Sequence, residues 1–224
     1  MNSRSQILAT IQENKPEFIP FPQVPAFKFD AKYVVEQFCE IANRVGSKVI
    51  TVSGYEEIEQ FIKETYQEKQ RIVSEIPELS QTTNTDFSQA VTPHSFHDVD
   101  LAIIKAHFGV AENGAVWVSE ELMGQRVIPF ITQHLAIILN AKDVVATMHQ
   151  AYEQLANAQY GYGCFIAGPS KTADIEQSLV IGAHGARSLT VFLLGEGGEG
   201  NIKKKIEICP VIADKSSLKL IFSL

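Results

Sequence analysis

Cysteine is scarce in this chain of 224 residues, which holds Cys39, Cys164 and Cys209 at wide separations. Because no Cys-x-x-Cys pair is present, these thiolates alone can build neither a zinc ribbon nor an iron–sulfur cluster. Structural disulfides are equally unexpected. We therefore expect no metal site and no resident cofactor in this chain. Any redox metal would have to come from a partner.

Positive charge and long apolar runs are also lacking. The 26 acidic residues outnumber the 19 Lys and Arg, and the formal net charge is −7. The lysines at 203–205 form the only basic cluster, so the basic face that nucleic acid requires is absent. No apolar run approaches the ~18–20 residues that cross a bilayer. The amphipathic start at 1–13 lacks the apolar core of a signal peptide. We expect a cytoplasmic protein without a membrane span.

Hydrophobic residues make up 45% of the chain, a level typical of a globular protein. The length allows one large domain with a well-buried core. We place this domain at residues 1–194, with an N-terminal helix and a Pro- and Phe-rich arm at 14–29 that packs on the surface. The glycine-rich stretch at 195–200 indicates a linker. The tail at 202–224 is either two strands or an appendage.

Apolar strands alternate with amphipathic helices, which predicts an α/β fold with a mostly parallel sheet flanked by helices. Helices are expected at 31–45, 55–67 and 142–156, and again after Gly168. Asn113 and Gly114 lie between two apolar runs, at 108–111 and 115–118. This pattern predicts an antiparallel hairpin inserted midway. Further strands are expected at 48–53, 71–76, 101–104, 135–139, 163–167 and 188–194.

The Gly-Pro turn at 168–169 follows an apolar strand and precedes a polar segment. Ser170 and Thr172 are plausible N-caps of a helix, and Asp174 complements the positive end of the helix dipole. A helix N-terminus leaves backbone N–H groups unpaired and can bind an anion. Gly168, Ser170, Thr172 and Asp174 are therefore predicted to hold a small carboxylate or phosphate. The alternative is an ordinary capped junction between a strand and a helix.

Two further residues are candidates for catalysis. Glu112 follows an apolar strand, where a partly buried carboxylate could act as a general acid–base group or a nucleophile. His184 stands in a Gly-Ala-His-Gly turn at 182–185 and could act as a base or ligand donor. The alternatives are an exposed hairpin glutamate and a surface histidine.

Other polar residues suggest weaker sites. Arg126 could bind a substrate carboxylate with its two-pronged guanidinium, or form a surface salt bridge. His94 and His97 could chelate a divalent ion only if they lie on a helix, and Pro93 favours a loop.

Three segments stand out by their order and spacing: Gly-Val-Ala-Glu-Asn-Gly at 109–114, Gly-Pro-Ser-Lys-Thr-Ala-Asp-Ile-Glu at 168–176 and Gly-Ala-His-Gly at 182–185. Together they resemble the LUD domain family, in its lactate utilization C branch. The resemblance covers roughly residues 1–194. It implies a fold similar to the NagB/RpiA/CoA-transferase group. It also implies a role, as a component without a metal centre, in oxidising L-lactate to pyruvate alongside iron–sulfur subunits.

One departure concerns the ligand. Where the family usually has Ala-Glu-Thr-Gly-Thr, this chain carries Asn113 and Ala115 and so loses two hydroxyls. We therefore count Asn113 among the candidate ligand contacts, and the substrate is open.

Two other functions fit the same residues. The run Glu112-Asn113-Gly114 resembles the Glu-Asn-Gly of class I CoA-transferases, which implies an acyl or CoA transferase with Glu112 as nucleophile. The second alternative is a regulatory module that binds a small anion and catalyses no reaction. The sequence leaves open whether the chain is an enzyme.

Overall fold

A five-stranded parallel sheet forms the centre of the protein. The computed structural model describes residues 2–20, 22, 33–67, 69–83, 92–156, 158–173, 179–181 and 184–195. All four pairings in this sheet are parallel, which confirms the predicted fold class. The strand order is β1 (Ser47–Val52), β11 (Ser188–Leu194), β6 (His134–Asn140), β3 (Leu101–Lys105) and β2 (Ile72–Ser74).

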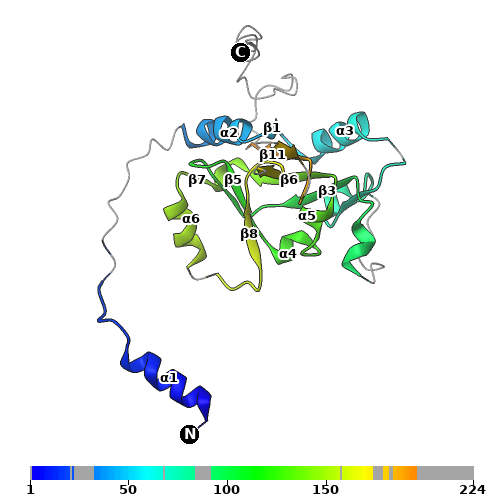
Figure 1. Ribbon diagram of the computed structural model, residues 1–224. Helices are drawn as coiled ribbons and strands as arrows, with labels where there is room; N and C mark the ends of the chain where they lie inside the picture. The colour runs from blue at the N-terminus through cyan, green and yellow to red at the C-terminus, as the bar shows by residue number, and fades with distance from the viewer. Residues whose placement is uncertain are drawn as a thin grey trace, which may run out of the picture.

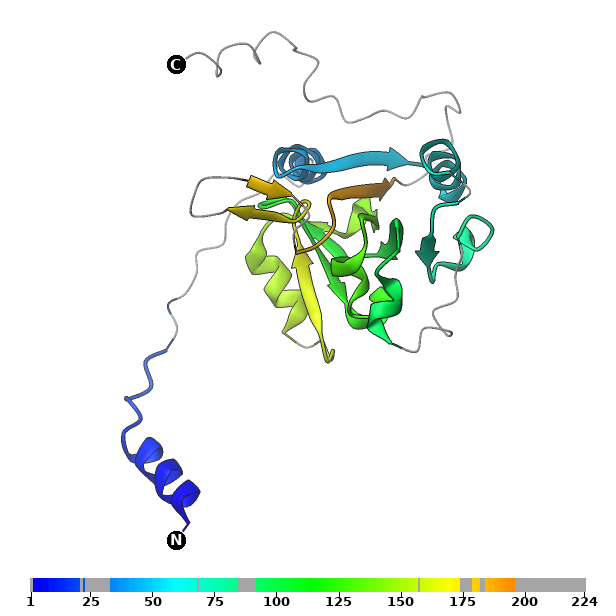
Figure 2. The same cartoon turned by 45° about the vertical axis from the view of Figure 1, so that its right-hand side comes forward.

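Two amphipathic helices flank β1 in the sequence and lie near opposite ends of that strand (Figures 1 and 2). Helix α2 (Val34–Arg44) buries Phe38, Cys39 and Ala42, and α3 (Tyr55–Thr65) buries Ile58 and Ile62. In each helix the buried residues recur at spacings of three or four, the period of a helix face. Both predicted helices are confirmed.

A second sheet of four strands contains the predicted hairpin. Its order is β7 (Val144–Val145), β4 (Phe108–Val110), β5 (Ala115–Ser119) and β8 (Gly163–Ile166). Strands β4 and β5 pair antiparallel across the Asn113-Gly114 turn, as predicted. The hairpin lies at the centre of this sheet and is not inserted in the parallel one.

The helix predicted after Gly168 is wrong. Residues Lys171–Ala173 form β9 and Leu179–Ile181 form β10, and the two strands pair antiparallel. Thr172, Val180 and Ile181 are β-branched, and such residues favour strands over helices. Asp174 and the neighbouring residues at 175–178 lie outside the described chain.

The helix predicted from residue 142 begins later than expected. Ala141–Asp143 form a 3-10 turn (η5), Val144 and Val145 form β7, and α6 runs over Met148–Leu155. Thr147 and Gln150 make a capping box at its start, and this box fixes where the helix begins.

Short helical segments lie in several of the described connections. The α-helical ones are α4 (Glu120–Met123) and α5 (Ile128–Ile131), and the 3-10 turns are η2 (Pro77–Leu79) and η4 (Pro93–Phe96).

The N-terminal helix is present as α1 (Ser3–Glu13) and buries none of its side chains. Phe18 is 83% exposed, so the expected packing of the arm is wrong at this residue. Residues 21 and 23–32, which include most of the second half of the arm, and residues 196–224 lie outside the described chain. Within the part that is described, no helix is long and apolar enough to span a membrane.

Two apolar clusters cover the two faces of the parallel sheet. Neighbouring residues of β6 belong to different clusters, because side chains alternate along a strand: Ile137 joins one and Ile138 the other. The Ile137 cluster also holds Phe38 of α2 and Val116 of β5. The Ile138 cluster holds Ile58 of α3. The second sheet is therefore part of the main core.

Candidate functional site

A cavity of about 280 Å³ brings together three of the predicted site residues, Gly168, Ser170 and His184. It lies at the amino ends of the central strands, since Leu135 and Leu189 near the starts of β6 and β11 line it. The rest of its lining comes from α5, from the end of β8 and from two turns: Pro129, Phe130, Phe165, Ile166, Ala167, Pro169, Lys171, Gly185 and Ala186.

The turn at residue 168 requires glycine, because the chain passes very close to the end of α2 at this point. Gly168 has a φ of +78°, and a Cβ there would lie 2.5 Å from the carbonyl oxygen of Val45. Only glycine satisfies both demands without strain. The backbone N–H of Ser170 then donates to the carbonyl of Ala186 at 2.9 Å. This bond holds the 168–171 segment against the chain that carries His184.

The polar groups of the cavity differ from those expected. The segment after Gly168 is a strand and not a helix start, so it does not present the predicted unpaired N–H groups of a first helical turn. The Ser170 N–H is already paired with the Ala186 carbonyl. Among the described residues that line the cavity, the candidates for binding an anion are the Ser170 hydroxyl, the exposed His184 ring and the Lys171 ammonium. Lys171 Nζ donates to the carbonyl of Val45, which places its charge beside the turn. Thr172 lies in β9 opposite Val180.

Glu112 and Asn113 lie outside this cavity, on the turn between β4 and β5. Glu112 is exposed, so its expected partial burial is wrong. Its Oε2 accepts the N–H of Met148 at 2.8 Å, at the first residue of α6. The Asn113 Oδ1 accepts the N–H of Ala115 at 3.0 Å and shapes the turn. Both side chains have local structural contacts, and a role in catalysis or ligand binding stays a prediction.

Arg126 also lies away from the cavity lining. Its Nε donates to Glu120 Oε2 at 2.7 Å, which is the surface ion pair considered as its alternative role. The Glu120 carboxylate also accepts the N–H groups of Gly161 and Tyr162, at 2.8 and 3.1 Å. The Arg126 guanidinium and these backbone donors hold the pKa of the Glu120 carboxyl below its usual range. A substrate carboxylate would have to compete with Glu120 for Arg126.

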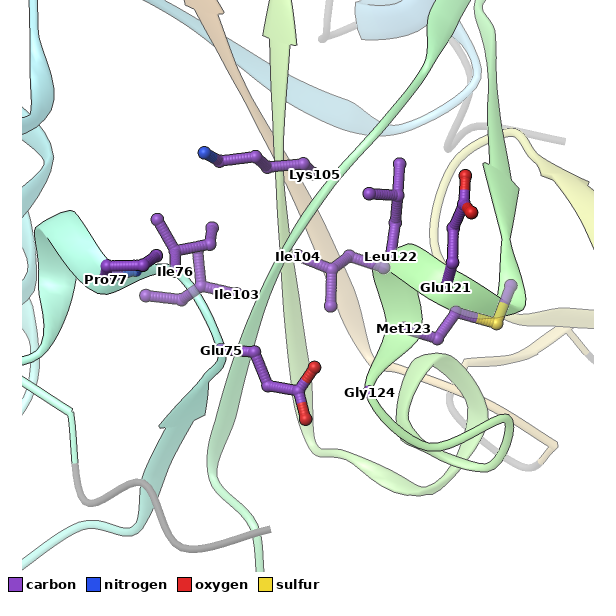
Figure 3. Close-up of a pocket in the computed structure, with 10 residues that line it drawn as sticks. All are labelled: Glu75, Ile76, Pro77, Ile103, Ile104, Lys105, Glu121, Leu122, Met123 and Gly124. Carbon is purple, nitrogen blue, oxygen red and sulfur yellow. The ribbon is translucent and has the colours of Figure 1, made fainter.

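A second cavity, of about 150 Å³, lies at the carboxyl ends of β2 and β3 (Figure 3). Glu75 follows β2, Lys105 ends β3, and Glu121 comes from α4. Apolar side chains, among them Ile103 and Met123, form much of the wall. The sequence reasoning missed this cavity. It could have been predicted from the general rule that open α/β sheets bind ligands beyond the carboxyl ends of their strands.

One of the charged side chains around this second cavity, Lys105, already interacts with neighbouring residues. Figure 3 shows the Lys105 ammonium directed away from the carboxylates of Glu75 and Glu121. It lies 3.6 Å from Glu78 Oε1 and 5.3 Å from the centre of the Tyr55 ring. Partial burial disfavours the charged form, but Tyr55 and Glu78 outweigh it and raise the pKa of Lys105. Lys105 therefore stays protonated at neutral pH.

No metal centre emerges among the residues whose positions are described: they contain no group of three or more His, Cys, Asp or Glu side chains that could hold an ion. His94 lies on η4, and His97 follows it with its Nδ1 2.9 Å from the His94 carbonyl oxygen. This short 3-10 turn is not the α-helix that chelation by the pair would need.

The sequence pattern of the LUD domain matches residues 35–194. This segment covers both sheets and the cavity that holds Gly168, Ser170 and His184. The chain belongs to the LUD domain family.

Curated relatives carry the name lactate utilization protein C. The one from Shouchella clausii is 31% identical over 114 residues, which is 49% of each chain. The one from Oceanobacillus iheyensis is 28% identical over 101 residues, 42% of this chain and 43% of the relative. The Geobacillus thermodenitrificans protein is 34% identical over 92 residues, 38% of each chain. The matched part thus spans less than half the length of these relatives.

A solved structure has the same fold. The crystal structure of a DUF162 family protein from Deinococcus radiodurans superposes with a TM-score of 0.55 at 15% sequence identity. The match covers 75% of this chain and all of that one.

Proposed function

We propose that this chain acts in lactate utilization as a component without an iron–sulfur cluster, supporting the oxidation of L-lactate to pyruvate. The observation that carries the proposal is the LUD domain at 35–194, together with relatives named lactate utilization protein C. The three family-like segments at 109–114, 168–176 and 182–185 all fall within this domain.

Electron transfer from lactate is assigned to iron–sulfur partner subunits. Cys39 is buried in α2, Cys164 is half-buried in β8, and Cys209 is far from both in the sequence. Burial raises the pKa of the Cys164 thiol, which disfavours the thiolate that a metal would need. Partners that carry clusters are therefore the proposed route for the electrons.

The ligand proposed for the 280 Å³ cavity is a small carboxylate. Pockets for drug-sized molecules start at ~300 Å³, so this cavity suits a smaller ligand. Ser170 can donate its hydroxyl hydrogen to the carboxylate, while Lys171 supplies positive charge. His184 lies where it could exchange a proton with the hydroxyl of a 2-hydroxy acid.

Titration calorimetry with L-lactate tests this ligand site. Ser170→Ala should weaken binding by roughly 1.5–3 kcal/mol, for a lost hydrogen bond to the carboxylate, and His184→Gln by roughly 0.5–1.5 kcal/mol, for one to the neutral hydroxyl. Ser53→Ala, an exposed serine after β1, is the matched control and should bind as the unmodified chain does. Binding that is unchanged in both cavity variants would remove this cavity from the proposal.

Association with partners is tested separately, by recovering the tagged chain from its native host grown on L-lactate. The proposal expects iron–sulfur proteins to copurify. A clean preparation without them would contradict the partner assignment. Labelling of Glu112 by acyl-CoA and borohydride would then support the transferase alternative, and lactate binding alone would support a regulatory module.

A further inference from the structure

We propose that Ser119 and His107 form a nucleophile–base pair that accepts an acyl group from an activated ester. The pair lies outside the Ser170–His184 cavity, and the inference is independent of lactate and of partner subunits. Ser119 ends β5, and His107 lies in the connection between β3 and β4.

The distance between the two side chains is that of a working pair. Ser119 Oγ lies 2.7 Å from His107 Nε2, within the range at which a base accepts a hydroxyl proton. Ser119 is 4% exposed, so its hydroxyl is held in place by the surrounding structure. His107 is only half-buried, and its side chain is 34% exposed. The His107 ring can therefore be reached from solvent, and both residues line a cavity.

The Ser119 hydroxyl does not do what its position predicts. Ser119 is the N-cap of α4, where a serine oxygen normally accepts a backbone N–H of the first turn. No such bond is formed, and the hydroxyl contacts His107 instead. A residue that breaks a local rule in this way marks a candidate functional site.

A third cavity, of about 210 Å³, opens beside the pair. The rings of Phe108, Trp117 and Tyr160 line it and pack on one another, with centroid distances from Trp117 of 6.5 Å to Phe108 and 5.3 Å to Tyr160. These rings suit the aromatic leaving group of an aryl ester. Gln154 and Gln159 also line the cavity, and a carboxamide N–H is a group that can donate to an ester carbonyl oxygen.

The charge that develops on the base has a partner. Glu121 Oε1 lies 3.4 Å from His107 Nε2, the nitrogen that also contacts Ser119. Glu121 therefore stabilises the protonated ring and does not fix its tautomer through the opposite nitrogen. It is a positioning residue in this scheme, since it acts through His107.

The reaction needs only the ester and water. His107 Nε2 takes the Ser119 proton while Oγ bonds to the ester carbonyl carbon. The bond from that carbon to the aryl oxygen then breaks, and the ring returns its proton to the departing oxygen. Water activated by His107 hydrolyses the acyl-serine, releasing a carboxylic acid and restoring Ser119.

The test treats the full chain with 4-nitrophenyl acetate, follows nitrophenolate release and locates the acetyl group by peptide mass spectrometry. We expect acetylation at Ser119, none at this position in Ser119→Ala, and acetylation slower on the order of 10²-fold in His107→Gln. The controls are His97→Gln and Ser53→Ala, both at exposed positions, and they should react as the unmodified chain does.

Two results would overturn the inference. One is a folded, unmodified chain whose Ser119 is unacetylated and that releases nitrophenolate no faster than Ser119→Ala does. The other is an unchanged rate of Ser119 acetylation in a folded His107→Gln protein. Ser119→Cys guards against a folding artefact, because a thiol at this position should take up the acetyl group if the pair is accessible. Circular dichroism establishes that each variant is folded.

Discussion

Gly114 is the residue at which the hairpin turn contacts helix α2. Its φ is +67°, and a Cβ at this position would lie 2.6 Å from the backbone nitrogen of Ala42. Backbone atoms of a helix cannot move aside as a flexible side chain would. The close packing of this turn on α2 therefore depends on glycine.

Gly114→Ala should lower the free energy of unfolding by about 2–4 kcal/mol, the sum of left-handed backbone strain and overpacking. Urea denaturation measures this change. Gly195→Ala is the control, since a Cβ there meets no atom within 4 Å. Equal stability of the two variants would show that the turn can move away from α2.

Glu120 and Arg126 give a prediction for pH. The lowered pKa of Glu120 in the folded chain means that its contribution to stability is present above the unfolded value of 4.5. This contribution is lost as the pH falls through the folded pKa. Arg126→Gln should move the Glu120 pKa upward, as followed by NMR titration of its carboxyl carbon. A pKa that does not move would assign the shift to the backbone N–H groups of Gly161 and Tyr162.

At the scale of elements, the start of α6 depends on side chains as well as on the helix itself. Thr147 is 7% exposed and accepts the N–H of Gln150, while Glu112 accepts the N–H of Met148. Thr147→Ala should lower the free energy of unfolding by about 1 kcal/mol. Thermal denaturation compares it with Thr65→Ala, at an exposed helix end, which should change stability little. An unchanged midpoint in Thr147→Ala would mean that Glu112 alone suffices.

Elements with a clear period were predictable from the sequence. The apolar spacing of α2 and α3, the runs of β6 and β11 and the Asn113-Gly114 turn all have local causes. The segment around Lys171–Ala173 was not predictable, because hydroxyl and acidic residues gave a helix-start signal there. The antiparallel pairing of β9 with β10 outweighed that signal.

The candidate sites also differ in how far the sequence predicts them. Gly168, Ser170 and His184 line one cavity because the turns that carry them meet there, and their role in binding a ligand stays a prediction. The pairing of His107 with Ser119 was not found, since neither residue stands in a motif. It depends on how β4 and β5 pair, which places the connection before β4 beside the end of β5.

At the scale of the whole molecule, the two sheets share one core. Phe38 of α2 is fully buried in the cluster that joins them, and its ring lies 3.0 Å from where a Cβ on Gly109 would be. Phe38→Ala should lower the free energy of unfolding by about 3–5 kcal/mol. In urea, the far-ultraviolet and near-ultraviolet circular dichroism of Phe38→Ala should lose amplitude in the same transition. Phe18→Ala, at an 83% exposed position, is the control. Separate transitions in Phe38→Ala would indicate that the sheets unfold independently.

We propose above all that this LUD domain protein supports L-lactate oxidation by partners that carry the iron–sulfur clusters. The most direct test is lactate-dependent dye reduction by extract of the native host from which the chain has been removed. Adding back the purified chain should restore the rate, and adding His184→Gln should restore less of it. A rate that is the same with and without the chain would contradict the account.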